Sequence, residues 1–125
     1  PAVLSVGGLP AALDELAGRV PLPVTLQLAA VRCAPMLEET LWFVACEAVA
    51  NAVKHASANR LTLSLVLEGT DIRLTCSDDG NGLADSRGSG LQGLADRVEA
   101  VGGRLVVRGV PGHGSTVEAV VLCGS

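Results

Sequence analysis

The segment that decides the fold is LEETLWFVACEAVANAVKHA, residues 37–56. It holds no Gly or Pro, and on a helical wheel of about 100° per residue it is apolar on almost every side. A helix of this kind is buried on most of its surface. Its second half nevertheless carries Glu47, Asn51 and Lys54 at positions i, i+4 and i+7, with His55 at the edge of the same stripe.

This polar stripe has two interpretations. Burying such groups unpaired costs several kcal/mol, so they need partners. In the first interpretation they form a solvated seam, with Glu47 and Lys54 as ordinary surface charges. In the second they form a polar wall that faces a ligand cavity.

The segments on either side of this helix predict a mixed sheet. Alternating apolar residues predict strands at 23–30, 60–67, 71–77, 104–109 and 115–122, and helical spacing predicts helices at 9–20 and 91–103. This order predicts an α+β fold, a two-layer α/β sandwich in which helices cover one face of a mixed sheet of about five strands. At 125 residues, the chain is expected to be a single domain, residues 1–125.

Composition excludes several classes of protein. With 49% apolar and 18% charged residues, the chain is not disordered. Aromatic residues make up only 2%, so the core has to be built from Val, Leu and Ala, with Trp42 and Phe43 as its only large members. The net charge of −4 and the scattered basic residues exclude nucleic acid as a partner. No apolar run approaches the ~20 residues that a membrane span needs.

The four cysteines, Cys33, Cys46, Cys76 and Cys123, form no C-x-x-C pair and have no histidine at ligand spacing. Three of them lie in apolar periodic segments, where Cys behaves as a small hydrophobe. We therefore expect four reduced structural thiols and a reducing compartment. The chain starts at Pro1 without Met, and we expect it to be a piece of a longer protein.

A glycine-rich string, GSGLQG at residues 88–93, spells G-x-G-x-x-G. A dinucleotide site needs a strand before this string and an acidic residue about 20 positions later, and neither is present, so NAD is excluded. Gly88 and Gly90 instead let backbone amides approach a ligand at the start of the helix at Leu91, where a phosphate is favoured. Ser89 and Gln92 have the spacing of a capping box for that helix.

A second loop, DDGNG at residues 78–82, follows a predicted strand. A calcium loop is excluded because the twelfth position from Asp78 is Ser89 and not Glu. A hairpin turn fits poorly, since a polar loop and not a returning strand comes next. The remaining interpretation is an aspartate that accepts a hydrogen bond at the rim of a pocket.

In this order, four motifs resemble the ATP-binding catalytic domain of two-component sensor histidine kinases, which has the Bergerat fold. EAVANAVKHA (47–56) is similar to the asparagine box, and DDGNGL (78–83), GSGLQGLADRVEAVGG (88–103) and GHGSTV (112–117) are similar to the glycine boxes. The branch that pairs with LuxR-type response regulators is the most similar. The resemblance covers nearly the whole chain and is strongest over 39–121.

The resemblance implies a role for each matching residue. Asn51 would coordinate Mg²⁺, Glu47 would hold metal-bound water or help to polarise the nucleophile, and Lys54 and His55 would neutralise phosphate charge. Asp78 would bind the adenine amino group. Gly80 and Gly82 would leave room for the adenine ring, and Gly88, Gly90 and Leu91 would close over the phosphates. Leu83 would also contact ATP, and Thr116 would do so through a water.

The resemblance also implies partners. The two histidines, His55 and His113, fall within the boxes, so the phosphorylated histidine is expected on an upstream dimerisation domain of the same parent protein. A response regulator, a cytoplasmic location, a parent that is soluble or membrane-anchored, and a monomeric isolated domain are expected with it. Two alternatives are an anti-sigma-factor-type serine kinase and a degenerate nucleotide-sensing module without catalysis.

Overall fold

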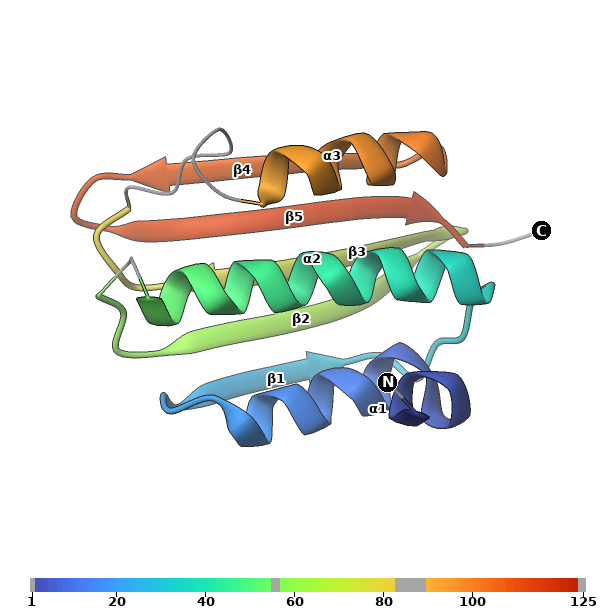
Figure 1. Cartoon of the computed structure of the whole chain (residues 1–125), viewed down its shortest axis with the longest axis horizontal. Coiled ribbons are helices and arrows are strands. Elements are labelled where there is room, and N and C mark those ends of the chain that lie inside the picture. Colours follow the sequence, from blue (N-terminus) through green and yellow to red (C-terminus); the bar gives the residue numbers. More distant parts are fainter. Residues whose placement is uncertain (1, 55–56, 83–89, 124–125) are drawn as a thin grey trace.

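The computed structural model of the chain describes residues 2–54, 57–82 and 90–123. Its elements, in chain order, are α1 (Ala2–Arg19), β1 (Val24–Leu28), α2 (Pro35–Lys54), β2 (Leu61–Glu68), β3 (Asp71–Asp78), α3 (Leu91–Ala100), β4 (Arg104–Val110) and β5 (Gly114–Leu122). The strands form one sheet in the order β1-β2-β3-β5-β4. β1 runs parallel to β2, and the other neighbouring strands are antiparallel. Helices α1, α2 and α3 lie on one face of this sheet (Figure 1), which confirms the predicted two-layer α+β fold.

The sheet has one apolar face, which packs against the helices. On β2, Leu61, Leu63 and Leu65 are buried while Thr62 between them is exposed. The predicted strands at 60–67 and 71–77 correspond to β2 and β3, which pair in antiparallel register as a hairpin. The same alternation buries one set of side chains on β3 and β5: Ile72, Leu74, Cys76, Val117, Ala119 and Val121.

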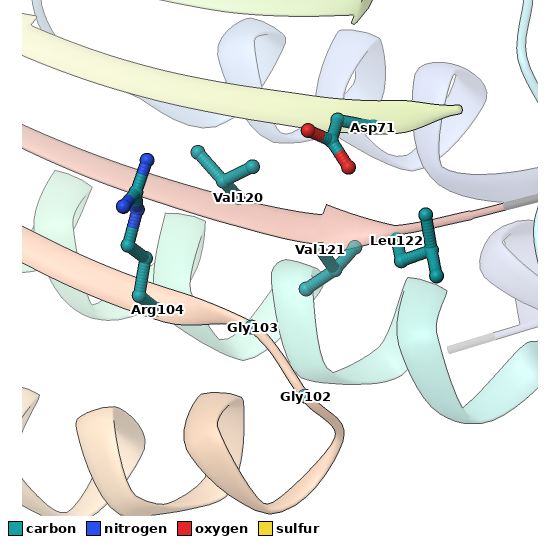
Figure 2. A pocket seen from close by; sticks show the side chains of 7 residues that line it. All are labelled: Asp71, Gly102, Gly103, Arg104, Val120, Val121 and Leu122. Atoms are coloured by element: carbon teal, nitrogen blue, oxygen red, sulfur yellow. The ribbon is translucent and has the colours of Figure 1, made fainter. Parts of the chain in front are cut away.

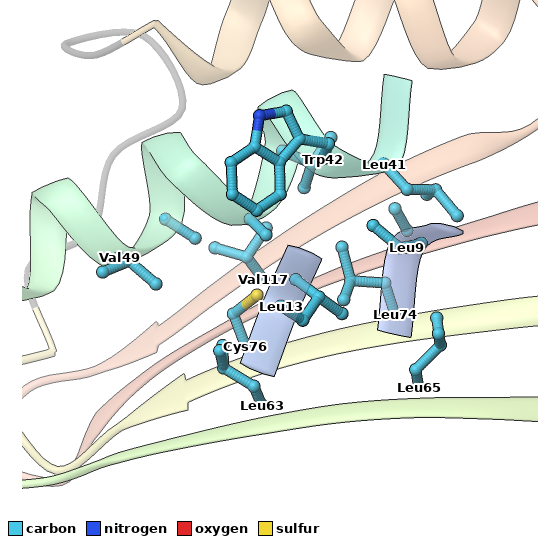
Figure 3. Close-up of a cluster of buried hydrophobic side chains, with 14 of the residues drawn as sticks. Leu9, Leu13, Leu41, Trp42, Val49, Leu63, Leu65, Leu74, Cys76 and Val117 are labelled. Atoms are coloured by element: carbon cyan, nitrogen blue, oxygen red, sulfur yellow. The ribbon is translucent and has the colours of Figure 1, made fainter. Parts of the chain in front are cut away.

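Helix α2 is the centre of the core. It begins at Pro35, a residue suited to the first helical turn because its missing N–H is not needed there. Leu41, Val44 and Ala45 are completely buried. Figure 3 shows side chains of α2 gathered with those of the sheet. Among the described residues, no helix has the length and apolar character that crossing a membrane would require.

The two large aromatic residues have different environments, although both were expected in the core. Trp42 is buried, with 6% of its surface exposed, whereas Phe43 is 38% exposed. Because Phe43 points towards α3 and not the sheet, the guanidinium of Arg97 lies over its ring, 4.8 Å from the centroid. The expectation that Phe43 belongs to the core is therefore wrong.

Helix α1 is longer than predicted and is kinked. The sequence predicted a helix over 9–20, but α1 starts at Ala2 and has a break at Gly8, whose φ is 79° and ψ −173°. The second segment is anchored to α2, because the Leu9 N–H donates to Glu38 Oε2 at 3.2 Å. Glu38 is 4% exposed and also pairs with Arg32, whose Nε lies 3.2 Å from the same oxygen.

Two of the four cysteines are paired, contrary to the prediction. Cys33, just before α2, forms a disulfide with Cys123, just after β5, across a sequence separation of 90 residues. No spacing rule could pair them, because the fold alone brings their Cα atoms to 5.5 Å. Cys46 and Cys76 are free, and burial raises the pKa of both, to about 12 for Cys76. The inference of a reducing compartment therefore loses its basis.

Candidate nucleotide-binding site

The predicted polar stripe lies on the C-terminal half of α2. Glu47 and Asn51 are half-buried and Lys54 is exposed, whereas Ala48 and Ala52 beside them are buried. The stripe therefore runs along the edge of the helix where the core meets solvent. An acid, an amide and an amine are presented there on one rigid element. His55 lies outside the described residues.

Glu47 lies against the beginning of α3. The backbone N–H of Gly90 donates a hydrogen bond to Glu47 Oε2 at 3.3 Å. A Cβ atom at position 90 would lie 2.9 Å from Glu47 Oε1, so a larger residue would push the carboxylate away. Gly90 is the N-cap of α3 and Leu91 is its first residue. The structure thus brings Glu47, Gly90 and Leu91 together, while Leu83, Gly88 and Ser89, the predicted N-cap, lie outside the described residues.

Asp78 is the last residue of β3 and is half-buried. Its Oδ1 accepts a hydrogen bond of 2.8 Å from the backbone N–H of Gly80, which fixes the carboxylate on its own turn. In Figure 1 the end of β3, the C-terminal end of α2 and the β4–β5 turn lie at the same side of the molecule, on the left. The alternation of β3 places Asp78 on the helix-covered face with Cys76.

Asp79 holds the same loop in place and was not recognised from the sequence. Its Oδ1 accepts hydrogen bonds from the backbone N–H groups of Asn59, at 2.8 Å, and Arg60, at 3.0 Å. These two bonds hold the pKa of Asp79 below its ordinary value. The loop after β3 is therefore tied to the segment that precedes β2.

Gly82 has a structural reason to be glycine. Its φ is +73°, and a Cβ atom there would collide with the backbone carbonyl of Val110. The loop is further tied to the β4–β5 turn, because the Gly112 N–H donates to the Asn81 carbonyl at 2.8 Å. Close backbone approach also fixes Gly114, where a Cβ atom would meet the carbonyl of Asp78. The expectation that Gly82 leaves room for a ring stays a prediction.

The register of β3 and β5 separates Thr116 from Asp78. Asp78 pairs with Ser115, and Thr116 pairs with Ser77 on the other face of the sheet. The Thr116 and Ser77 hydroxyl oxygens are 3.3 Å apart. Thr116 therefore lies on the face of the sheet opposite to Asp78, and its expected contact with ATP through a water stays a prediction. The hydroxyl beside Asp78 belongs to another residue. Ser115 takes that place, and the alternation of buried residues on β5 was the signal that could have identified it.

Ser115 carries a buried group that needs a partner. It is 6% exposed, and within residues 2–54, 57–82 and 90–123 its Oγ atom is completely buried without a hydrogen-bond partner. Such a group normally has a protein or water partner, because leaving it unpaired costs free energy. An orphaned hydroxyl next to the Asp78 carboxylate fits a polar ligand, or a water bound with it, at this end of the sheet.

The described residues supply part of the oxygen ligands that a hard divalent cation needs. Within the described parts of the chain, no three His, Cys, Asp or Glu side chains come together as a metal site. Glu47 and Asn51 offer two oxygen donors one helical turn apart. Mg²⁺ accepts such a set, because it usually keeps several waters and takes further oxygens from substrate phosphates.

A separate hollow lies at the opposite end of the sheet. Its volume is about 330 Å³, and its lining includes Asp71, at the start of β3, and Arg104, at the start of β4 (Figure 2). None of the predicted site residues lines it. It is therefore distinct from the candidate site around Asp78.

Comparison with known families identifies the chain. Residues 36–123 match the model of the family described as histidine kinase-, DNA gyrase B-, and HSP90-like ATPase. This match covers more than half of the chain and includes α2, the Asp78 loop, α3 and the β4–β5 hairpin. The chain belongs to this ATPase family, which confirms the resemblance seen in the four motifs.

Curated relatives are sensor kinases. The chain is 26% identical over 118 residues to the sensor histidine kinase LiaS of Bacillus subtilis (strain 168), covering 91% of this chain and 33% of LiaS. It is 38% identical over 82 residues to the signal transduction histidine-protein kinase/phosphatase UhpB of Salmonella typhimurium, covering 63% of this chain and 16% of UhpB. The chain thus spans a third or less of these relatives.

Solved structures share the fold. The histidine kinase domain of the blue-light activated histidine kinase from Erythrobacter litoralis EL346 superposes with a TM-score of 0.73 at 21% identity, covering 90% of this chain and 57% of that chain. The ATP-binding domain of PrrB from Mycobacterium tuberculosis gives a TM-score of 0.69 at 24% identity, covering 94% of this chain and 92% of that chain. The fold is therefore that of histidine kinase ATP-binding domains.

Proposed function

We propose that this chain is the ATP-binding catalytic domain of a sensor histidine kinase, which binds Mg-ATP and donates the γ-phosphoryl group to a histidine on an upstream dimerisation domain. The observation that carries the proposal is the pairing of Asp78 with Ser115 in the register of β3 and β5. It puts an acceptor and an unpartnered hydroxyl side by side within the region that matches the ATPase family.

Asp78 and Ser115 are proposed to select the adenine base. A carboxylate accepts hydrogen bonds only, so Asp78 suits the exocyclic amino group of adenine and not the carbonyl of guanine. The hydrogen bond from Gly80 to Oδ1 holds the carboxylate in one orientation. The Ser115 hydroxyl can bond a water or a ring nitrogen, so ligand binding would satisfy a group that is otherwise unpaired.

Residues of α2 and α3 are proposed to hold the phosphates. Asn51 and Glu47 would supply oxygen ligands to Mg²⁺, which would neutralise phosphate charge. Lys54, exposed at the end of α2, would add a positive charge. Gly90 and Leu91 start α3, where backbone N–H groups favour an anion. Phosphoryl transfer needs mainly this positioning and charge stabilisation.

The partners and location follow from the same proposal. The relatives named histidine kinases are much longer than this chain, which supports a parent protein with an upstream histidine-containing domain. We place the domain in the cytoplasm, because ATP is the proposed phosphoryl donor, although a disulfide such as Cys33–Cys123 is uncommon in that compartment. A response regulator of the LuxR type would receive the phosphoryl group. Neither the serine kinase nor the degenerate module is favoured by any structural observation.

Isothermal titration calorimetry with ATP and Mg²⁺ tests the adenine assignment. Asp78→Asn should lower ATP affinity about ten- to a hundred-fold, since it removes a charge-assisted hydrogen bond. Asp71→Asn is the matched control, because Asp71 lies at the other end of the same strand. Undiminished ATP binding by Asp78→Asn, or no ATP binding by the unmodified chain, would refute the proposal.

Radiolabelled ATP tests the need for a separate acceptor domain. We expect the chain, incubated with Mg-ATP, to stay unlabelled, because its histidines lie within the motifs proposed to bind the nucleotide. Stable label on the chain would contradict this part of the proposal.

A further inference from the structure

The N-terminus of α3 is formed by a residue without a side chain. Gly90 is the N-cap, and the first turn of α3 contains no acidic residue. The Gly90 carbonyl accepts the first helical hydrogen bond, from Leu94 N at 3.3 Å. The N–H groups at a helix start have no partner within the helix and carry the positive end of its dipole. An anion at this point stabilises the helix.

The anion comes from another helix. Glu47 of α2 accepts the Gly90 N–H at 3.3 Å, across a sequence separation of 43 residues. The approach depends on glycine, since a Cβ at position 90 would come within 3.0 Å of the Glu47 carboxyl carbon. Glu47 thus occupies the place where the proposed function puts a phosphate.

Glu38 and Glu47 differ in burial and in pairing. Glu38, also on α2, accepts the Leu9 N–H but is buried and paired with Arg32. Glu47 is half-buried, and within the described residues no cation pairs with it. A carboxylate at the boundary with solvent loses little when it leaves, because water replaces the backbone donor.

We propose that Glu47 is a positioning residue that caps α3 in the nucleotide-free protein and gives up this place to a nucleotide phosphate. This inference rests on the proposed function, because it assumes that phosphate reaches the start of α3. No covalent step is involved. The Glu47 carboxylate would move from Gly90 towards Asn51 only when nucleotide is bound. Nucleotide binding and the release of Glu47 from α3 would therefore be coupled.

Three variants separate the contact from the charge. Glu47→Ala removes both the contact and the charge, and Glu47→Gln keeps an acceptor without charge. Gly90→Ala keeps the charge but displaces the carboxylate, and Gly90 has an ordinary helical φ of −69° that alanine adopts. Glu39→Ala is the control, because Glu39 lies on the same helix and its carboxylate is 4.0 Å from the guanidinium of Arg97 in α3.

Amide hydrogen exchange at residue 90 measures directly how well Glu47 protects the Gly90 N–H. Without nucleotide, Glu47→Ala and Gly90→Ala should speed exchange at this amide about two- to five-fold, with Glu47→Gln between them and the unmodified chain. Glu39→Ala should exchange like the unmodified chain. With saturating ADP, Glu47→Ala and the unmodified chain should exchange alike. Equal exchange rates without nucleotide, or a difference that persists with ADP, would overturn the inference.

Affinity for Mg-free ADP gives the second readout. Glu47→Ala should bind ADP about two- to five-fold more tightly, because the competing anion is absent. Adenosine, which has no phosphate, should bind equally to both. If Glu47→Ala binds ADP more tightly but leaves amide exchange at residue 90 unchanged, Glu47 only repels the phosphate charge. That result would refute the proposal that Glu47 caps α3. If the unmodified chain binds neither ADP nor ATP, the proposed function fails. Amide hydrogen exchange without nucleotide would still test the contact between Glu47 and Gly90.

Discussion

Glu38 and Glu47, on the same helix, each accept a hydrogen bond from the backbone N–H at the start of a neighbouring helical segment. Glu38 Oε2 is 3.2 Å from Leu9 N in α1, and Glu47 Oε2 is 3.3 Å from Gly90 N before α3. Helix α2 therefore orients both of its flanking helices through carboxylates. One contact is buried and supported by Arg32, and the other lies at the edge of the candidate site.

The buried contact should matter for stability. Glu38→Ala leaves the Leu9 N–H without its acceptor, so we expect the free energy of unfolding to fall by about 2–4 kcal/mol. Glu39→Ala is the matched control and should cost less than about 0.5 kcal/mol, because the Glu39 side chain is 59% exposed. Urea denaturation monitored by circular dichroism measures both. Similar losses for the two variants would contradict the assigned role of Glu38.

The unpartnered hydroxyl of Ser115 should matter for binding and not for folding. Ser115→Ala removes a buried group without a partner among the described residues, so the free energy of unfolding should stay equal or rise by up to about 1 kcal/mol. ATP affinity should fall about three- to ten-fold, since a hydrogen bond is lost. Thr116→Val, on the opposite sheet face, should bind ATP normally. Calorimetry showing loss for Thr116→Val alone would reverse the assignment.

The Asp79 contact predicts a pH dependence of stability. The Asn59 and Arg60 amides hold the pKa of Asp79 below its ordinary value in the folded protein. A depressed folded pKa contributes stability that is present above the unfolded pKa and is lost as the pH falls through the folded value. The stability difference between the unmodified chain and Asp79→Asn should therefore be constant at neutral pH and shrink below about pH 4. A difference that grows on acidification would contradict this.

The disulfide should be the largest single contribution to stability. By the chain-entropy model, closing a loop of this length contributes about 4–5 kcal/mol. Reduction with dithiothreitol should therefore lower the melting temperature, and a variant with both Cys33→Ser and Cys123→Ser should melt like the reduced protein. Added reductant should leave that variant unchanged. Equal melting temperatures for oxidised and reduced protein would show that the bond contributes nothing.

Much of the fold could be predicted because its signals are local. The alternation on β2 and β3 and the uninterrupted apolar helix around Leu41 each depend on residues close in sequence. The Glu47–Asn51–Lys54 stripe was predicted for the same reason, since helical spacing alone places three side chains on one side.

What was missed depends on contacts between distant residues. The break at Gly8 is fixed by Arg32 and Glu38, and the Cys33–Cys123 bond spans most of the chain. The start of α3 at Leu91 was predicted correctly, but the contact between Gly90 and Glu47 was missed because the two residues are 43 positions apart in the sequence. Ser115, which pairs with Asp78, was not singled out, although the strand period of two places it on the same face of the sheet.

The bond between Cys33 and Cys123 encloses every motif of the candidate site in one covalent ring. A protease that cuts once anywhere inside this ring would produce two pieces that remain joined. On a denaturing gel they would migrate as one band without reductant and as two with it, so a nicked sample can pass unnoticed unless the gel is run both ways.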